Sequence, residues 1–328
     1  MTRAGGQPLR LGIMGCSEFA VRTMIAAIRT VPELQLVAVA SRTAAKAADY
    51  AQRFACEGIA GYEQLLARED IDGIYIALPT GLNVQWVAKA LEAGKHLLVE
   101  KSFAPDFRST HELVGLARRR NRLVTENISF HYHLQYAWTR EQIAKGALGD
   151  VHLLRANFSF PPLKPGNFRY DPALGGGALL DTGAYMVKVT RLFLGEELTL
   201  LGSSLRYDPS LGVDIEGTAA FVAQSGAVAQ VAFGFNSFYQ CNWELVGSLG
   251  KLVVERGYTA PPTLATVVRL ERQGQRDEFT LAPENHYRTK LVEFARATRD
   301  ASEYPKHWDD VESQSRHLDA IRQAALRL

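Results

Sequence analysis

The sequence predicts an α/β protein with two domains: a doubly wound parallel sheet over residues 1–125, and an α+β domain with an open, mainly antiparallel sheet over residues 126–328. In the first part, short apolar runs alternate with helical patterns, which is typical of parallel strands covered on both faces. Beyond residue 126, strand patterns follow one another across short turns, which favours antiparallel pairing. A chain of 328 residues is also long enough for two domains.

The elements of the first domain are predicted from the spacing of apolar residues. Strands are expected at residues 9–14, 34–40, 74–78, 96–100 and 123–126. Helices are expected at residues 19–28, 43–54, 83–93 and 106–120. Asp106 is the expected N-cap of the last of these helices, and Gly94 is expected to end the third in the left-handed conformation.

The second domain begins with a predicted helix at 133–145, a strand at 151–160 and a loop containing Pro161, Pro162 and Pro165. A glycine triplet precedes a helix expected at 178–194. The strands that follow are expected at residues 198–207, 216–222, 227–235, 242–247, 251–255 and 267–271, and two helices at 285–299 and 309–328 complete the chain.

Composition excludes several classes of protein. Hydrophobic residues make up 47% and charged residues 22%, which is ordinary for a globular protein, and the net charge of +2 is too small to indicate a nucleic-acid partner. Cys16, Cys56 and Cys241 form no CxxC pair, so neither a disulfide framework nor a zinc site is expected. The apolar runs are too short for a signal peptide or a membrane span. We expect a cytoplasmic protein without a membrane partner.

A glycine-containing turn joins the first strand to the first helix. Residues 12–20 read GIMGCSEFA, and Gly15, Ser17 and Ala20 occupy the three positions of the G-x-G-x-x-G/A fingerprint of Rossmann domains, which bind dinucleotides. Gly15 allows the tight turn and Ala20 allows close helix packing, while Ser17 replaces the glycine that normally lets the backbone approach the pyrophosphate. The alternative is an ordinary strand–turn–helix connection.

The end of the second strand bears on which dinucleotide binds. An acidic residue there would bind the ribose 2′-hydroxyl of NAD, but the chain has Ser41 and Arg42, and the nearest acid, Asp49, lies inside the next helix. A guanidinium matches a phosphate in charge and geometry, so NADP is predicted. The alternative is that Arg42 only caps a surface turn.

Two groups of polar residues are candidates for catalysis. Lys101 follows a buried strand beside Glu100, at the sheet end where ligands bind in such folds, and a lysine there can donate a proton to a ketone oxygen. Asp181 and Tyr185 are four residues apart on one helical face after the glycine triplet, and would form a proton-delivery set if they faced Lys101. The alternatives are a solvated charge pair for the first group, and helix-start charge and core packing for the second.

The chain resembles the Gfo/Idh/MocA oxidoreductase family over essentially its whole length. The resemblance lies in GIMGCSEFA, VAVASR, AGKH with VEKS, Glu126-Asn127, and LGGGALLDTGAY with FLG. Within the family, ENISFHYHLQ, FSFPPLKPGNFRY and the tyrosine that ends the glycine motif are similar to the NADPH-dependent sugar 3-ketoreductases of deoxysugar biosynthesis. Those enzymes reduce the C-3 ketone of a nucleotide-linked 3,4-diketo-2,6-dideoxyhexose. The resemblance implies a substrate of this kind, with dTDP as the expected nucleotide.

The resemblance implies roles for named residues. Lys101 and Tyr185 would lie at the carbonyl oxygen, one of them donating the proton, and Asp181 would orient the sugar. The residues implied to bind NADP are Gly15, Cys16, Ser17, Phe19, Ser41, Arg42, Leu78, Pro79, Asn83, Glu100, Lys101, Asn127 and Arg169. The residues implied to bind the substrate are His131, Lys164, Asp181 and Tyr185. Lys164 and Arg169 could meet the diphosphate or could be solvated loop charges.

Two departures from the family pattern lead to further expectations. The usual Glu-Lys-Pro is Glu-Lys-Ser here, and because a cis bond before a non-proline residue costs about 2.5–4 kcal/mol, we expect a trans bond between Lys101 and Ser102. Asn83 stands where the family has a histidine. His131 and His133 have no acidic or thiol partner at a suitable spacing, so no catalytic metal is expected.

Two other functions remain open at this point. One is a dehydrogenase of a free sugar, polyol or trans-dihydrodiol, and the other is a non-catalytic NADP-sensing regulator, against which Lys101 and Tyr185 argue. The open sheet needs a cover, so a homodimer or homotetramer is expected.

Overall fold

The computed structural model describes residues 7–328. Its contacts divide the chain into two compact units, each of which is described by itself. The first comprises the chain up to Asn127 together with Tyr287–Ser315, and the second comprises Ile128–His286 and Arg316–Leu328.

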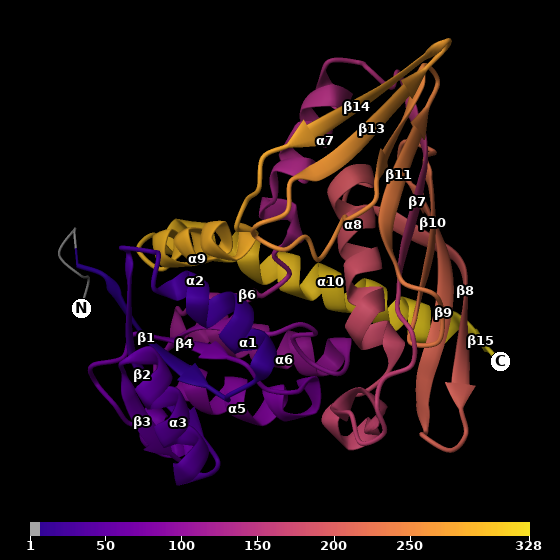
Figure 1. Cartoon of the computed structure of the whole chain (residues 1–328). Coiled ribbons are helices and arrows are strands. Elements are labelled where there is room, and N and C mark those ends of the chain that lie inside the picture. The colour runs from indigo at the N-terminus through magenta and orange to yellow at the C-terminus, as the bar shows by residue number, and fades with distance from the viewer. Residues whose placement is uncertain (1–6) are drawn as a thin grey trace. The chain divides into compact units, whose positions relative to one another are not determined.

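The first unit is built on a six-stranded parallel sheet in the order β3-β2-β1-β4-β5-β6 (Figure 1). The strands are β1 (Leu9–Met14), β2 (Leu34–Ser41), β3 (Glu57–Ala60), β4 (Gly73–Ile76), β5 (His96–Val99) and β6 (Val124–Glu126). The order reverses between β1 and β4, which creates the switch point at which ligands bind in open α/β sheets. The predicted parallel sheet is confirmed. Edge strand β3 was missed because most of its residues are exposed and form no apolar run.

The helices of this unit begin and end largely where their capping residues indicate. They are α1 (Glu18–Ala20), a π-helical turn (Val21–Ile25), α2 (Ala26–Ile28), α3 (Ala44–Phe54), α4 (Tyr62–Leu66), α5 (Thr80–Glu92) and α6 (Phe107–Arg120). The Asp106 carboxylate accepts from Ser109 N at 2.7 Å, and Gly94 has a φ of 72°, so both predicted helix ends are confirmed.

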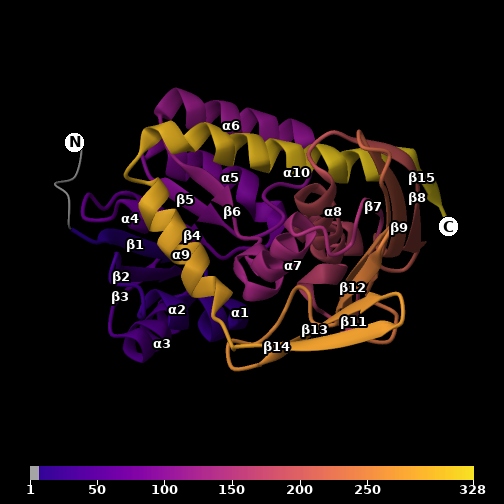
Figure 2. The ribbon, with the colours of Figure 1, turned by 90° about the horizontal axis from the view of Figure 1, so that it is seen from above.

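Two segments from the end of the chain complete this unit. Most of α9 (His286–Ala297) and the first part of α10 (Tyr304–Ala324) belong to it, although the sequence analysis placed both helices in the second domain. Leu291 and Phe294 are buried in the same core as the parallel strands. The first part of α10 lies along α6 (Figure 2), where Arg118 Nη2 donates to Glu312 Oε2 at 2.7 Å.

The second unit contains a nine-stranded sheet in the order β14-β13-β12-β11-β7-β10-β9-β8-β15. Its strands are β7 (Val151–Ser159), β8 (Leu198–Asp208), β9 (Val213–Ala223), β10 (Val228–Gly234), β11 (Gln240–Gly247), β12 (Gly250–Val254), β13 (Thr266–Arg272), β14 (Gln275–Leu281) and β15 (Ala325–Arg327). The pairs β7–β10 and β8–β15 are parallel and the others antiparallel, so the predicted mainly antiparallel sheet is confirmed. Strand β14 was missed because its sequence, QRDEFTL, is mostly polar and exposed.

Helix α8 (Ala184–Leu194) packs on β7 and β10 of this sheet. The helix expected at 178–194 instead begins with a π-helical turn, Leu179–Gly183. Gly183 is closely packed there, since a Cβ atom on it would lie 3.2 Å from Leu179 Cδ1. Helix α7 (Leu134–Ala144) and the short 3₁₀ turns Phe130–Tyr132, Phe168–Tyr170 and Pro172–Leu174 complete the unit.

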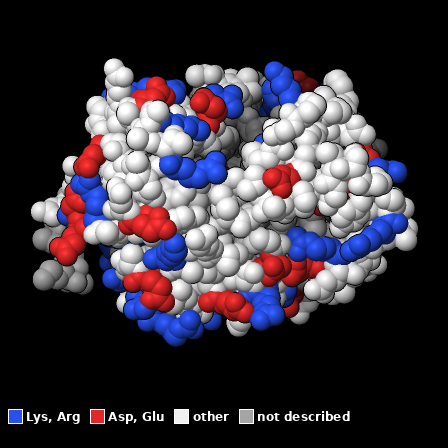
Figure 3. Space-filling model, turned by 90° about the horizontal axis from the view of Figure 1, so that it is seen from below, with Lys and Arg blue, Asp and Glu red and all other residues white. Residues whose placement is uncertain are grey.

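On the face drawn in Figure 3, basic and acidic side chains are interspersed. Within residues 7–328, no helix is long and apolar enough to cross a membrane.

Candidate active site

The fingerprint turn depends on a glycine with a left-handed backbone. Gly15 has a φ of 97°, and its N–H donates to Ala40 O at 3.0 Å. A Cβ atom at this position would lie 2.7 Å from Ala77 O, so any side chain would push β1 away from the end of β4. Ser17 Oγ accepts from Ala20 N at 3.1 Å and starts the helix. The other N–H groups of the first helical turn can therefore bind a phosphate.

Tyr50 supports this turn from α3, and the sequence analysis missed it. Its hydroxyl donates to Cys16 O at 3.3 Å and lies 3.3 Å from Glu18 Oε1. The signal in the sequence was a tyrosine on the apolar side of helix 43–54. Burial raises the pKa of the Cys16 thiol to about 11, so Cys16 is a neutral packing group in the turn. Phe19 is exposed and packs edge-to-face on Tyr287 of α9, with ring centroids 6.1 Å apart.

The end of β2 carries a positive charge and no acidic residue. Ser41 is buried and its carbonyl accepts from Gly61 N at 2.8 Å, while Arg42 is exposed. Thr43 caps α3, and Asp49 lies inside that helix, where it pairs with Arg53 at 3.6 Å. A 2′-phosphate fits these residues better than a ribose hydroxyl, because the exposed guanidinium offers charge and no carboxylate is present to accept from the hydroxyl.

Polar side chains converge at the ends of β4 and β5. Leu78 is buried and Pro79 precedes α5, as its N-cap. Asn83 is fully buried on α5, and its Nδ2 donates to Ser102 O at 3.2 Å and to Glu100 O at 3.5 Å. Within the described chain, Asn83 Oδ1 is buried without a hydrogen-bond partner. Asn83 thus links the backbone on both sides of Lys101 to α5, and its own amide oxygen remains available as an acceptor.

Glu100 is half-buried and joins two buried side chains, Tyr75 and Asn127. Its Oε1 accepts from the Tyr75 hydroxyl and from Asn127 Nδ2, the latter at 2.7 Å. Burial raises the pKa of the Glu100 carboxyl, and the two hydrogen bonds and the charge of Lys101 oppose that rise. Sequence analysis named Glu100 and Asn127 but not Tyr75, which reads only as part of an apolar strand.

Lys101 is half-buried and lies two residues beyond Val99, the last residue of β5. The expected trans bond is wrong: the Lys101–Ser102 peptide bond is cis. The expectation was based on the energetic preference of an isolated peptide bond for the trans form. In the folded chain, tertiary hydrogen bonds hold the backbone after the Lys101–Ser102 bond. Asn83 fixes the Ser102 carbonyl, and Phe103 N donates to Glu126 Oε1 at 2.8 Å.

In the second unit, the glycine triplet packs against its own chain. Gly175 and Gly177 have φ values of 74° and 114°. A Cβ atom on Gly176 would lie 2.5 Å from Arg169 O, and one on Gly177 would overlap the Asp214 carboxylate. Asp214 Oδ2 accepts from Leu179 N at 2.6 Å, which anchors the π-helical turn. The glycines therefore set the path of the chain into α8.

This turn carries Asp181, which is held by an arginine. Arg169 Nε donates to Asp181 Oδ2 at 2.6 Å, and the guanidinium lies over the Phe168 ring, 4.7 Å from its centroid. The two residues were predicted separately, one for the cofactor and one for the sugar. The structure joins them into one ion pair.

Tyr185 follows on α8 and is held by aromatic rings. Its ring centroid is 5.1 Å from that of Phe158, 5.6 Å from that of Tyr258 and 6.0 Å from that of Phe130. These contacts fix the direction of a half-buried phenol. Lys101 belongs to the first unit, while Asp181 and Tyr185 belong to the second.

The remaining predicted site residues are Lys164 and His131. Lys164 is exposed in the proline loop, and the His131 ring packs on Tyr132 with centroids 4.2 Å apart. His133 Nδ1 accepts from Gln135 N at 3.2 Å, which makes it the cap of α7. In the described part of the chain, Glu293, Glu303 and His307 could hold a metal, but Arg296 and Lys306 already pair with the carboxylates. Glu293, Glu303 and His307 were not among the predicted site residues.

A parallel sheet with a glycine turn at its switch point and a lysine at a strand end, together with an open-sheet domain that carries a tyrosine, defines a dinucleotide-dependent oxidoreductase. The comparison with family models specifies which. Residues 9–128 match the model described as "Oxidoreductase family, NAD-binding Rossmann fold", and residues 136–253 match the "GFO/IDH/MocA C-terminal domain". The chain belongs to the Gfo/Idh/MocA oxidoreductase family, as the sequence analysis predicted.

Similar proteins carry one recurring name. A protein of Saccharopolyspora spinosa named dTDP-3,4-didehydro-2,6-dideoxy-alpha-D-glucose 3-reductase is 43% identical over 89% of this chain and 88% of its own length. A Streptomyces violaceoruber protein of the same name is 38% identical over 97% of this chain and 95% of its own length. The crystal structure of the 3-ketoreductase KijD10 from Actinomadura kijaniata, in complex with NADP and TDP-benzene, has a TM-score of 0.95 at 34% identity, covering 98% of this chain and 99% of that one.

Proposed function

We propose that this protein uses NADPH to reduce the C-3 ketone of a dTDP-linked 3,4-didehydro-2,6-dideoxyhexose. The observation that carries the proposal is the similarity, over nearly the whole chain, to reductases of that name. The likeness to a ketoreductase structure that contains NADP and a TDP compound supports it.

The first unit offers a fitting site for the cofactor, which supplies the hydride. The turn at Gly15 and the helix start at Ser17 would hold the pyrophosphate, because they present N–H groups to it. Arg42 would hold the 2′-phosphate. Asn83 and Asn127 each keep a buried amide oxygen without a partner in the described chain, and such acceptors suit the donor groups of a nicotinamide nucleoside.

The reduction needs charge stabilisation and one proton at the ketone oxygen. As the carbonyl carbon accepts the hydride, its oxygen gains negative charge, which the Lys101 ammonium and the Tyr185 hydroxyl would stabilise as preorganised donors. One of the two transfers a proton to that oxygen, so the ketone, the hydride and the proton together give the alcohol. Aromatic contacts hold Tyr185 in place for this, and the backbone contacts of Ser102 hold Lys101.

The remaining groups of the second unit suit a nucleotide-linked sugar. Asp181 would accept from a sugar hydroxyl, and its pairing with Arg169 fixes the direction of the carboxylate. Arg169 and exposed Lys164 would contact the diphosphate, and His131 would line the sugar site. A free sugar offers no anion for these cations.

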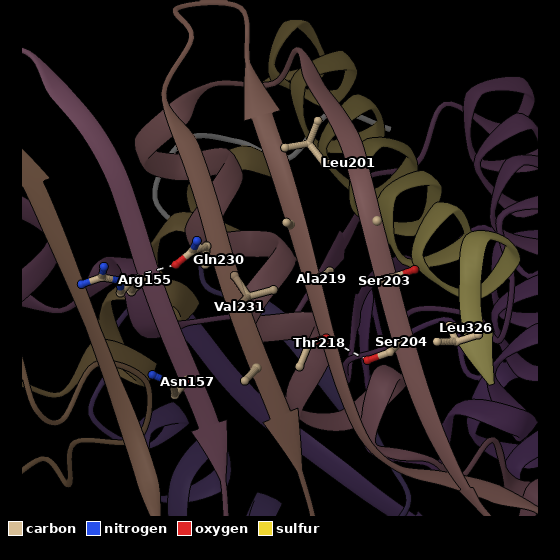
Figure 4. A pocket seen from close by; sticks show the side chains of 13 residues that line it. Arg155, Asn157, Leu201, Ser203, Ser204, Thr218, Ala219, Gln230, Val231 and Leu326 are labelled. Carbon is tan, nitrogen blue, oxygen red and sulfur yellow. Dashed lines mark hydrogen bonds between the residues drawn. The ribbon is translucent and has the colours of Figure 1, made fainter. Parts of the chain in front are cut away.

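We also propose a homodimer or homotetramer that is formed through the open face of the nine-stranded sheet. This face has a hollow of about 620 Å³, lined by residues of β7 to β10 and by Leu326 of β15 (Figure 4). Leu201 and Leu326 on it are 59% and 66% exposed. A second copy of the chain would remove this apolar surface from water.

The three cysteines are free in the structure, which fits a location in the reducing cytoplasm.

The test is an NADPH oxidation assay with the dTDP-linked diketosugar, its UDP-linked counterpart and free sugars. We expect turnover with the dTDP-linked compound, and product analysis should show a new hydroxyl at C-3. Turnover with free sugars or polyols alone would indicate a dehydrogenase of those compounds. Tight NADPH binding without consumption of NADPH by any of these compounds would indicate a sensor and overturn the proposal.

A further inference from the structure

The network around Glu100 links the ends of three adjacent strands. Tyr75 lies on β4 and is fully buried, Glu100 follows β5, and Asn127 follows β6. The Tyr75 hydroxyl and Asn127 Nδ2 both donate to the same carboxylate oxygen, Glu100 Oε1. Register pairs Tyr75 with Leu98 on β5, and Leu98 with Thr125 on β6, so the three side chains emerge from neighbouring positions of a rigid sheet.

This network determines which way the Asn127 amide points. Because Nδ2 is bound to an acceptor, Oδ1 must face away from Glu100. Oδ1 is buried and, across residues 7–328, has no hydrogen-bond partner. A buried acceptor without a donor costs about 1–3 kcal/mol, which a donor group of a bound ligand would recover.

The position of Asn127 in the sheet indicates which group that is. The adenosine half of a dinucleotide belongs to the side of β1 and β2, where Gly15 and Arg42 lie, and the cofactor crosses the switch point toward β4, β5 and β6. Asn127 follows β6, the last strand on that side. The nicotinamide ring of a bound cofactor would therefore lie on the side of Asn127, and the N–H donor that such a ring carries is its carboxamide.

We propose that Asn127 Oδ1 accepts the carboxamide N–H of NADPH and that Tyr75 is a positioning residue, which holds Asn127 in that orientation through Glu100. This inference rests on the proposed cofactor and adds how its reactive ring is oriented. The carboxamide fixes the rotation of the ring about its glycosidic bond, and hence which face presents its hydride to the ketone.

The test measures the dissociation constants of NADPH and of its reduced 3-acetylpyridine analogue by cofactor fluorescence. The analogue keeps the carbonyl group but has a methyl group in place of the N–H donor. Wild type should bind the analogue about tenfold more weakly than NADPH. In Asn127→Ala and in Tyr75→Phe that ratio should fall toward one, because NADPH binding weakens while analogue binding does not.

Tyr304→Phe is the matched control. Tyr304 is also a buried tyrosine of the first unit, and its hydroxyl donates to Thr298 O at 3.0 Å, away from the network. This variant should keep the wild-type ratio. A melting temperature measured for each variant identifies loss of the fold, and Asn127→Ala tests the acceptor even where Tyr75→Phe is unstable.

The outcomes separate the inference from the function on which it rests. The carboxamide contact is overturned if wild type binds NADPH and its analogue equally, or if a folded Asn127→Ala variant keeps the tenfold ratio. Neither result affects the reductase proposal. A ratio lost in Asn127→Ala but kept in folded Tyr75→Phe overturns the positioning role. Wild type that binds neither compound overturns the proposed cofactor and the inference together.

Discussion

Arg169 Nε lies 2.6 Å from Asp181 Oδ2, with the two side chains 29% and 14% exposed. The pair joins a loop that carries exposed cations to the π-helical turn before α8. The arginine fixes the direction of the carboxylate.

This pair leads to the first prediction. Asp181→Asn removes the charge and keeps the shape, so kcat/KM for the ketosugar should fall about ten- to a hundredfold, the effect of a hydrogen bond to a charged group. The dissociation constant of NADPH should stay within about twofold of wild type. Glu271→Gln, which breaks a similar pair with Arg269 on β13, is the control and should leave kcat/KM unchanged. A kcat/KM equal to wild type in Asp181→Asn would mean that this carboxylate does not touch the sugar.

The second prediction concerns the two proposed proton donors. Lys101→Ala and Tyr185→Phe should each lower kcat about a hundredfold, because each removes a donor from the developing alkoxide. Neither should raise the NADPH dissociation constant to a comparable extent, which fluorescence titration can check. A plot of kcat against pH should lose one limb in whichever variant lacks the proton donor. Full turnover in both variants would contradict the mechanism.

The third prediction uses two glycines with the same backbone angle. Gly15 and Gly61 both have a φ of 97°, but a Cβ atom on Gly15 would meet Ala77 O at 2.7 Å, whereas one on Gly61 meets no described atom within 4 Å. Gly61→Ala should therefore show only the left-handed backbone penalty of about 1–2 kcal/mol in the free energy of unfolding. Gly15→Ala should lose more stability and also NADPH binding. Equal losses in the two variants, measured by urea denaturation, would refute the steric argument.

The fourth prediction is that the stability of the second unit decreases in acid. Burial lowers the pKa of His286 to about 3, and the neighbouring His133 ring, with its centroid 5.7 Å away, adds to this. The unfolded chain binds this proton near pH 6.5, so between pH 6.5 and 3 it holds more protons than the folded chain, and stability falls as the pH falls. The loss from this residue approaches about 1.4 kcal/mol per pH unit.

Thermal unfolding at pH 7.5 and at pH 5 checks this prediction. Wild type should melt at a lower temperature at the lower pH. His286→Gln, which cannot take up the proton, should show a smaller difference between the two values. A variant with the same difference as wild type would show that another group causes the acid sensitivity.

The sequence predicted the parts of the site that depend on local chemistry. Gly15, Lys101 and Arg42 lie where strand ends and turn geometry placed them. The cis bond at Ser102, the pairing of Arg169 with Asp181 and the hydrogen bonds of Tyr75 and Asn127 to Glu100 depend on contacts between segments far apart in the chain or in irregular structure. Periodicity and spacing carry no information about such contacts. Strand β3 was missed because it has no apolar signature of its own. The π-helical turn Leu179–Gly183 lies inside an expected helix, and apolar spacing does not distinguish its geometry from that of an α-helix.

The discontinuity of the first unit affects how the chain is made. Leu291, Phe294 and Val311 are buried among strands that leave the ribosome some two hundred residues earlier. During synthesis, part of the apolar surface of the sheet therefore stays uncovered until nearly the whole polypeptide has been translated. Expression without the last fifty residues should yield an aggregating fragment rather than a compact nucleotide-binding module.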